Sequence, residues 1–409
     1  MSRIYVADKE TLDKVARAVG VDSENKIYGI KINKKNSNPA TRCTYLGDAV
    51  GMTPASMNFA TGEFNYGDWA NVWFVRDNFP CMLESNGAVA YKLNPNDYSK
   101  KEDGSDSDIS NAESGLNAMS AMPLVWIWQY EIGDFKYIYI ANYKVNDNYH
   151  AYAHQREDGT IAPYVFMSIF KGVQVGSDTM LRSLSGMQPV HSKTAQEEVS
   201  YAQENGYAWY TKTWAQRNLM QCLLTIMFRS TNSQEKLGWG NLQYVNDPSQ
   251  NYGKLETGTL NDKGQFWGRN DGEHQVKAFH QEAVWADQWD RIAGLINDNG
   301  VIKVKMTTPY NFDGSNYTVI AGVTPKGMNG GFIRGTLMTE FGDIPFDATG
   351  NSSSYECDTL WFNNSQVNYA LVGGYCDGTA ETCGLYNLRL NALSSVSLWS
   401  VGASLSCLP

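Results

Sequence analysis

The chain of 409 residues lacks an apolar run of about 18 residues, the length that a membrane-spanning helix needs, so we expect no membrane insertion. Its first residues, MSRIYVADKETLDK, are charged, unlike the apolar centre of a secretion signal, and this favours synthesis and folding in a cytosol. Charged residues make up only 19% and hydrophobic residues 42%, which excludes a disordered chain or a coiled-coil rod. The formal charge of −10 argues against a basic nucleic-acid-binding surface.

Motifs for common enzyme chemistry are also missing. The sequence contains no Gly-x-Ser-x-Gly, no phosphate-binding loop ending in Lys-Ser/Thr and no dinucleotide-binding glycine pattern. His150 and His154 have the spacing of a zinc-binding helix, but the accompanying Glu is absent. We therefore predict no catalytic residues, no metal site and no cofactor.

Cysteine is scarce and irregularly placed. The seven Cys include no Cys-x-x-Cys pair, and an odd number in a large chain suits free or buried thiols better than a disulfide framework. Cys376 and Cys383 are close enough in sequence to pair if the protein reaches an oxidising exterior. Both alternatives, a disulfide and two free thiols, stay open at this point.

Aromatic residues, in contrast, are abundant: they make up 12% of the chain, with 24 Tyr and 12 Trp. Tyr and Trp offer large, stiff and amphipathic contact area. A surplus of them indicates contact surfaces as well as core.

The residue pattern divides the chain into three parts. Residues 1–26 contain a short amphipathic helix (8–19), which either docks on its own domain or serves in self-association or attachment. Residues 27–118 form a small β-rich module, with strand-like runs at 27–32 and 71–75 and a polar, exposed loop at 99–118. Residues 119–409 form the remaining domain.

Within this third part we predict both strands and helices, hence an α+β fold. Strands are expected at 123–130, 135–143 and 301–306. Helices are expected at 195–206, with Thr194 as the N-cap, at 214–230, which is apolar around most of its circumference, and at 282–298. The last 110 residues suggest short strands joined by tight loops.

The segment 369–409 alternates apolar framework positions with polar or aromatic ones. The framework is formed by Leu371, Val372, Gly373, Gly374, Gly384, Leu385, Leu388, Val401 and Gly402. Outward Tyr, Asn and Ser on a rigid scaffold are typical of paratopes and sugar-binding sites, although a merely solubilising surface would look similar. The predicted ligand-binding residues are Tyr375, Asp377, Thr379, Glu381, Tyr386, Asn387, Arg389, Asn391, Ser395, Ser397 and Trp399.

This C-terminal layout resembles the terminal region of C-type-lectin-fold proteins of bacteriophages and prophages, including variable proteins diversified by retroelements. The resemblance includes the Gly-Gly turn at 373–374 and, upstream and in the same order, MLRSLSGMQP (180–189), the segments 206–241 and 282–306, and the end of the chain. These blocks cover roughly residues 120–409.

The resemblance implies a C-type-lectin-like (formylglycine-generating-enzyme-like) fold whose C-terminal strands and loops form the ligand face. It also implies a homotrimeric virion fibre, attached to other virion proteins through its N-terminus and binding a glycan or protein receptor on the bacterial surface. The lectin calcium signature is absent, because Trp285-Ala286-Asp287 does not replace it, so binding without calcium is expected. Cys376 and Cys383 do not occupy an evident copper site, so oxidase activity is not expected.

Three hypotheses from different classes follow. The favoured one is a phage tail-fibre or head-fibre adhesin located in the virion. A virion-associated polysaccharide depolymerase would instead need a carboxylate pair in a cleft. A structural decoration protein without receptor binding would bury its C-terminal face against other virion subunits.

Overall fold

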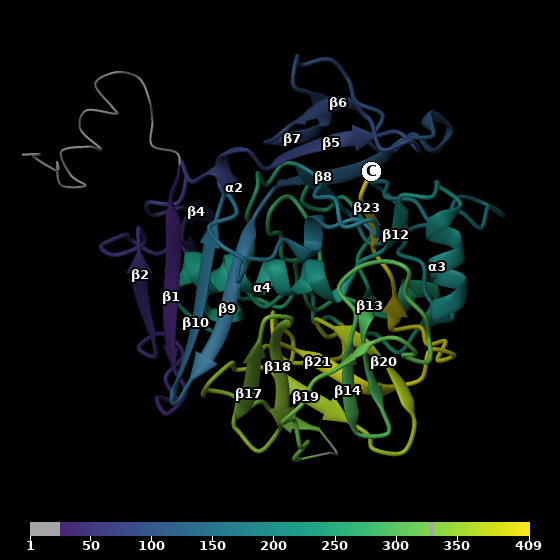
Figure 1. The fold of residues 1–409 in the computed structure, drawn as a ribbon. Coiled ribbons are helices and arrows are strands. Elements are labelled where there is room, and N and C mark those ends of the chain that lie inside the picture. The colour runs from purple at the N-terminus through teal and green to yellow at the C-terminus, as the bar shows by residue number, and fades with distance from the viewer. Residues whose placement is uncertain (1–24, 328–329) are drawn as a thin grey trace, which may run out of the picture.

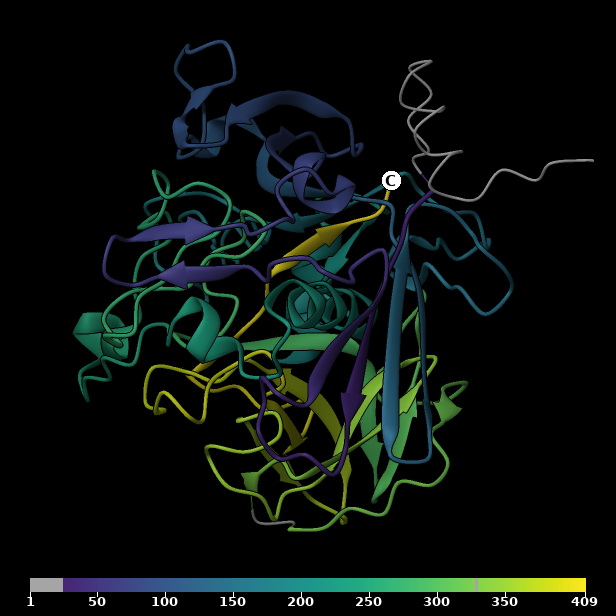
Figure 2. The same cartoon turned by 90° about the vertical axis from the view of Figure 1, so that its left-hand side faces the viewer.

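One buried helix, α4 (Trp214–Phe228), runs through the middle of the computed structural model, which describes residues 25–327 and 330–409 (Figure 1). The helix predicted at 8–19 lies outside the described residues. About 32% of the chain is strand and 12% helix, so the molecule is β-rich with few helices, which is compatible with the predicted α+β class. Three sheets surround α4, which Figure 2 shows end-on in the centre.

The first sheet is antiparallel and has four strands. Its order is β2 (Cys43–Gly47), β1 (Ile27–Asn33), β10 (Phe135–Ala141) and β9 (Trp126–Ile132). One face of it packs on α4 through alternate residues such as Ile30, Ile138 and Ile140. The strands predicted at 27–32 and 135–143 are confirmed.

The second sheet has seven strands, and the C-terminal strand lies inside it. Its order is β12 (Trp209–Thr211), β23 (Leu405–Cys407), β11 (Tyr164–Ser168), β8 (Asn117–Pro123), β5 (Phe79–Leu83), β6 (Val89–Asn94) and β7 (Asp97–Lys101). The predicted division at 118/119 falls within β8. Strands from both sides of that division share the first two sheets, because β1 pairs with β10 and β5 pairs with β8.

The third sheet is mixed and carries most of the C-terminal region. Its order is β15 (Thr318–Val319), β14 (Val301–Val304), β13 (Trp289–Asp298), β20 (Val367–Val372), β21 (Leu388–Ala392), β19 (Thr359–Phe362) and β16 (Gly331–Phe332), with β22 (Val401–Gly402) paired to β13. Two hairpins complete the strands: β3 (Ser56–Asn58) with β4 (Glu63–Asn65), and β17 (Gly335–Thr339) with β18 (Gly342–Asp347). The short strands predicted for this region are confirmed.

The remaining helices of the described residues are short. They are α2 (Trp73–Arg76), α3 (Ala195–Gln203), α5 (Ser233–Leu237) and the 3-10 turns η1 (Ala112–Ser114), η2 (Tyr152–His154) and η3 (Pro248–Gly253). In α3, the Thr194 side chain accepts from the backbone N–H of Glu197, whose carboxylate accepts in turn from the backbone N–H of Thr194. The predicted helix and its N-cap are confirmed.

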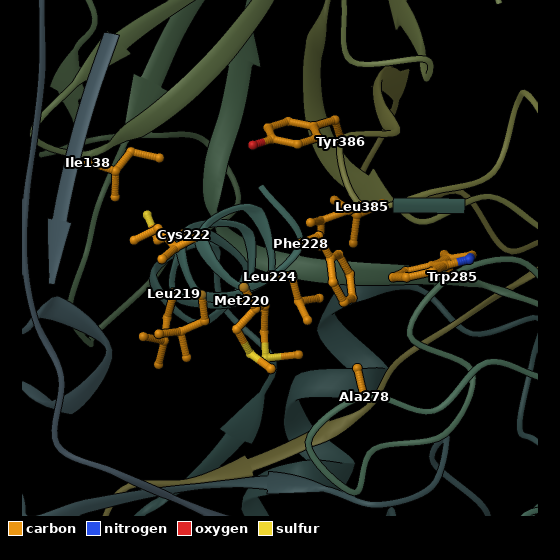
Figure 3. Close-up of a cluster of buried hydrophobic side chains, with 14 of the residues drawn as sticks. Ile138, Leu219, Met220, Cys222, Leu224, Phe228, Ala278, Trp285, Leu385 and Tyr386 are labelled. Carbon is orange, nitrogen blue, oxygen red and sulfur yellow. The ribbon is translucent and has the colours of Figure 1, made fainter. Parts of the chain in front are cut away.

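Helix α4 confirms the prediction of a central, buried helix. A second capping box, formed by Thr213 and Gln216, starts it, and every residue from Trp214 to Phe228 except Arg217 is buried. Figure 3 shows Leu219, Met220 and Phe228 among its side chains, packed with residues that come from all over the chain. A helix that is apolar around most of its circumference is expected in a core, and here the three sheets pack around it.

Three local predictions were wrong. Residues 282–298 are not a helix: turns lead into β13, a strand whose first nine residues are buried. Residues 71–75 contain the single turn α2 instead of a strand. The stretch 99–118 is not one loop, since it includes the end of β7, η1 and the start of β8.

Within the described residues, no helix is long and apolar enough to cross a membrane.

Candidate ligand-binding surface

The strand β21 shows how the C-terminal sheet sorts its residues. Leu388 and Leu390 point into the core around α4, whereas Arg389 and Asn391 alternate with them and are partly exposed. The Arg389 Nε donates to the Asn391 Oδ1 at 2.7 Å. The predicted facing of Leu388, Arg389 and Asn391 is confirmed.

Two predicted ligand-binding residues, Tyr386 and Asn387, do not face outward. Both are buried, because residues 384–387 form a turn in which strand alternation does not apply. The hydroxyl of Tyr386 lies 2.7 Å from the Thr225 Oγ1 on α4, and its backbone N–H donates to the Asp358 Oδ2 at 2.7 Å. Figure 3 shows the Tyr386 ring lying over α4.

Asn387 holds the same turn together from inside. Its Nδ2 donates to the Thr359 Oγ1 at 2.8 Å and to the Thr382 carbonyl at 2.6 Å. These contacts hold both side chains in the interior, so we exclude Tyr386 and Asn387 from the candidate site. The other predicted ligand-binding residues are at least partly exposed: Tyr375, Asp377, Thr379, Glu381, Arg389, Asn391, Ser395, Ser397 and Trp399.

Trp399 is the centre of an aromatic cluster. Its ring centroid lies 4.5 Å from that of Tyr252 and 5.3 Å from that of Tyr244, both stacked, and 5.8 Å from that of Tyr375. All four rings are partly exposed, Tyr244 to 36%. The structure thus brings together two predicted residues, Tyr375 and Trp399, with two from the loop at 244–252.

The cluster continues across the outer face of the third sheet. Tyr375 stacks on buried Trp289 at 5.9 Å, and Trp289 meets the edge of partly exposed Trp361 at 6.1 Å. Trp361 on β19 lies in register with Arg389 on β21. We call the residues Tyr244, Tyr252, Trp361, Tyr375, Arg389 and Trp399 the aromatic surface.

An unusual loop conformation positions Tyr252. Both Asn251 and Tyr252 have left-handed backbone angles, with φ of 50° and 58°. Gly253 follows with φ of 84°, where a Cβ would lie 1.8 Å from the Gln243 carbonyl oxygen, so only glycine fits. This backbone holds Tyr252 against Trp399.

Lys254 contacts both the backbone and the ring of Trp399. Its ammonium donates to the Trp399 carbonyl at 2.5 Å and lies 5.8 Å from the ring centroid. Burial lowers the pKa of Lys254 to about 8, although the nearby Asp287 carboxylate opposes this shift. Burial also lowers the pKa of Arg389 from its usual range, while Tyr375 opposes that change.

Cys376 and Cys383 are free thiols beneath this surface. The Cys376 Sγ donates to the Tyr252 carbonyl at 3.3 Å and the Cys383 Sγ to the Tyr375 carbonyl at 3.6 Å. Burial raises the pKa of each thiol to about 12, which disfavours the thiolate needed for a nucleophile or metal ligand. In this structure the two residues are therefore free thiols that pack in the interior.

The aromatic surface can stack on flat or apolar ligand faces, and its polar neighbours can form hydrogen bonds. In the described part of the chain, no group of three or more His, Cys, Asp or Glu side chains is arranged to hold a metal ion. Sequence analysis did not select five residues that lie at the site: Tyr244, Tyr252, Lys254, Trp289 and Trp361. The sequence feature that could have pointed to this loop is the presence of Tyr244 and Tyr252 in the polar stretch after α5.

A cleft of about 730 Å³ lies elsewhere, between α3, β12 and the loop at 306–312. It contains none of the predicted ligand-binding residues. We place the candidate site on the aromatic surface, because there the aromatic rings and a guanidinium lie together.

Comparison with known proteins adds no relative: no family model matches the chain, and no curated protein is similar to it.

Proposed function

We propose that this protein is a bacteriophage adhesin, a tail or head fibre that binds a receptor on the bacterial surface through the aromatic surface. The observation that carries the proposal is the series of partly exposed rings from Tyr244 through Trp399 to Tyr375, which buried Trp289 connects to Trp361, with Arg389 in register beside Trp361. Such rings supply stacking faces, and aromatic and Arg side chains contribute most of the binding free energy at many interfaces.

The position of the rings supports a binding role over a packing role. They lie on the side of the third sheet opposite the core around α4, where Leu388, Leu390 and Val372 already fill the interior. Large aromatic groups left half-exposed in a contiguous patch are typical of interaction sites. A ligand that covers them would remove apolar area from water.

The fold proposal is that residues 119–409 adopt a C-type-lectin-like arrangement. In support, four of the six residues of the aromatic surface come from C-terminal strands and loops, where the resemblance implies the ligand face, and the sheet beneath them packs on a buried helix. Attachment through residues 1–26, a homotrimeric state and location in the virion belong to the same proposal. A solution mass of three times the chain mass would support the trimer.

Binding of the purified full chain to intact bacteria and to immobilised bacterial surface polysaccharides tests the proposal. We expect binding without shortening of the polysaccharide. Cleavage of the polymer by the pure protein would favour a depolymerase instead. Absence of binding, with the aromatic surface protected from solvent in assembled particles, would favour a decoration protein.

A further inference from the structure

A second aromatic patch lies on the outer face of the first sheet, away from the aromatic surface. Strand alternation turns Ile127, Ile138 and Ile140 toward α4 and places Trp and Tyr side chains on the opposite face of β9 and β10. The rings concerned are partly exposed: Trp128, Tyr130, Tyr137 and Tyr139.

These four rings form one platform. Tyr130 stacks on Tyr137 at 5.0 Å with 13° between the planes, and Trp128 stacks on Tyr139 at 5.6 Å with 26°. Trp128 and Tyr130 lie 4.6 Å apart along the strand. Gly29 on β1 accommodates the platform, since a Cβ there would come within 2.6 Å of the Tyr139 ring.

The platform borders a cleft of about 420 Å³ at the outer edge of β9, where His150 pairs with Ile127, and this volume is within the range of small-molecule sites. In Figure 1 this edge faces the hairpin β17–β18. The cleft is open to solvent and combines ring faces with polar side chains. Among its lining residues are Trp128, Tyr130, Asn148, His150, Glu340 and Phe341.

The polar side of the cleft is held in place by stacked rings. His150 stacks on Tyr152 at 4.8 Å with 4° between the planes, and the Tyr152 hydroxyl donates to the Glu340 Oε2 at 2.9 Å. The His150 Nε2 lies 3.2 Å from the same oxygen. The Glu340 Oε1 makes no hydrogen bond within the described residues, and the side chain is 49% exposed.

We propose that this cleft binds a pyranose unit of a polysaccharide. The C–H face of the sugar lies on Trp128 and Tyr130, while the Glu340 carboxylate accepts hydrogen bonds from neighbouring hydroxyls and the Asn148 amide completes the polar contacts. A flat ring with one apolar face and polar edges matches this combination of groups. A phosphate or other anion does not, because the exposed carboxylate would repel it.

The site is separate from the aromatic surface, so its test does not depend on the proposed function. Cellotetraose, maltotetraose, chitotetraose and α-1,6-mannotetraose, each at up to about 10 mM, are titrated onto the full chain and followed by saturation-transfer NMR and calorimetry. We expect at least one of them to bind. We also expect Trp399→Ala to leave this binding unchanged.

Two substitutions locate the binding. Trp128→Ala should weaken it at least about 30-fold, and Glu340→Gln, on a side chain that is 49% exposed, about tenfold. Trp126→Ala is the matched control, because Trp126 lies on the same face of β9 but not in the cleft. Its effect should stay within about twofold.

Three results would overturn the proposal. They are no binding of any tetrasaccharide, equal binding by wild type and Glu340→Gln, or a concentration-dependent dimer that Trp128→Ala dissociates. The last result would identify the patch as a contact between two copies of this chain.

Discussion

The buried charge cluster around Lys136 makes a strong prediction about stability. Lys136 on β10 reaches the hairpin β17–β18, where its ammonium contacts the Asp343 carboxylate at 2.8 Å and the Thr336 hydroxyl. The Glu356 carboxylate lies 3.5 Å away and also pairs with Arg42 at 3.1 Å. The side chains of these ion pairs are at most 6% exposed, so the cluster joins the first sheet to the C-terminal half in a dry environment.

Lys136→Met should lower the free energy of unfolding by about 3–5 kcal/mol, because it leaves the Asp343 carboxylate buried without its cation. The matched control is Lys35→Met. Lys35 and Asp134 are even closer, at 2.6 Å, but their side chains are 74% and 49% exposed. Exposed pairs contribute about 0–1 kcal/mol, so this variant should behave almost like the wild type.

Urea unfolding followed by tryptophan fluorescence and far-UV circular dichroism measures both variants, and agreement of the two signals establishes a common transition. Adding Asp343→Asn to Lys136→Met should recover part of the loss, since the uncompensated charge is then gone. Equal costs for Lys136→Met and Lys35→Met would refute the reasoning, because burial would then make no difference.

Further predictions concern the C-terminal region. Tyr386→Phe should cost about 1–3 kcal/mol in urea unfolding, since it leaves the buried Thr225 hydroxyl without its 2.7 Å partner; an unchanged midpoint would contradict the buried assignment. Folding lowers the pKa of Lys254 from 10.5 to about 8. Below pH 8 the buried ammonium is charged and destabilises the folded state; as the pH rises toward 10.5 the folded protein loses this proton and the destabilisation disappears. The stability of the wild type relative to Lys254→Met should therefore rise by up to about 3 kcal/mol between pH 7 and 10.5, and a constant difference would count against it. Receptor binding should persist in EDTA; loss in EDTA and recovery with calcium would contradict our assignment of the site.

Sequence patterns predicted those parts of the fold that local interactions determine. The predicted N-cap Thr194 starts α3, and an apolar circumference marked α4 as buried. Alternation in 135–143 gave β10, and alternation in 388–391 gave the correct facing of Arg389 and Asn391. In each case the residues that form the sequence pattern lie within a few positions of the structural feature that they predict.

The failures have long-range causes. Residues 289–298 form a strand that is buried on both faces, so it lacks the alternation that would distinguish it from an apolar helix, and its partners β14, β20 and β22 all follow it in the chain. Ala286 and Asp287, both in left-handed conformations, interrupt the apparent helix. Tyr386 was assigned outward because a turn was taken for part of a strand.

Only part of the candidate site could be predicted from the sequence, because the rest depends on contacts between distant segments of the chain. Tyr375 and Trp399 stood out within one C-terminal pattern, whereas Tyr244 and Tyr252 meet Trp399 only through the tertiary fold. A left-handed loop conformation at 251–253 positions Tyr252 there. Sequence spacing contains no information about such a contact.

The most direct test of the central claim compares Trp399→Ala with the wild type in binding to bacterial surface polysaccharides and to whole cells. An equal melting temperature of the two proteins shows that the variant is folded. We predict a loss of at least about 30-fold, which corresponds to a binding hot spot of about 2 kcal/mol. Tyr207→Ala, which removes an aromatic side chain that is 93% exposed and lies outside the aromatic surface, serves as the control and should bind like the wild type. Undiminished binding by a folded Trp399→Ala variant would show that the receptor does not bind at the aromatic surface.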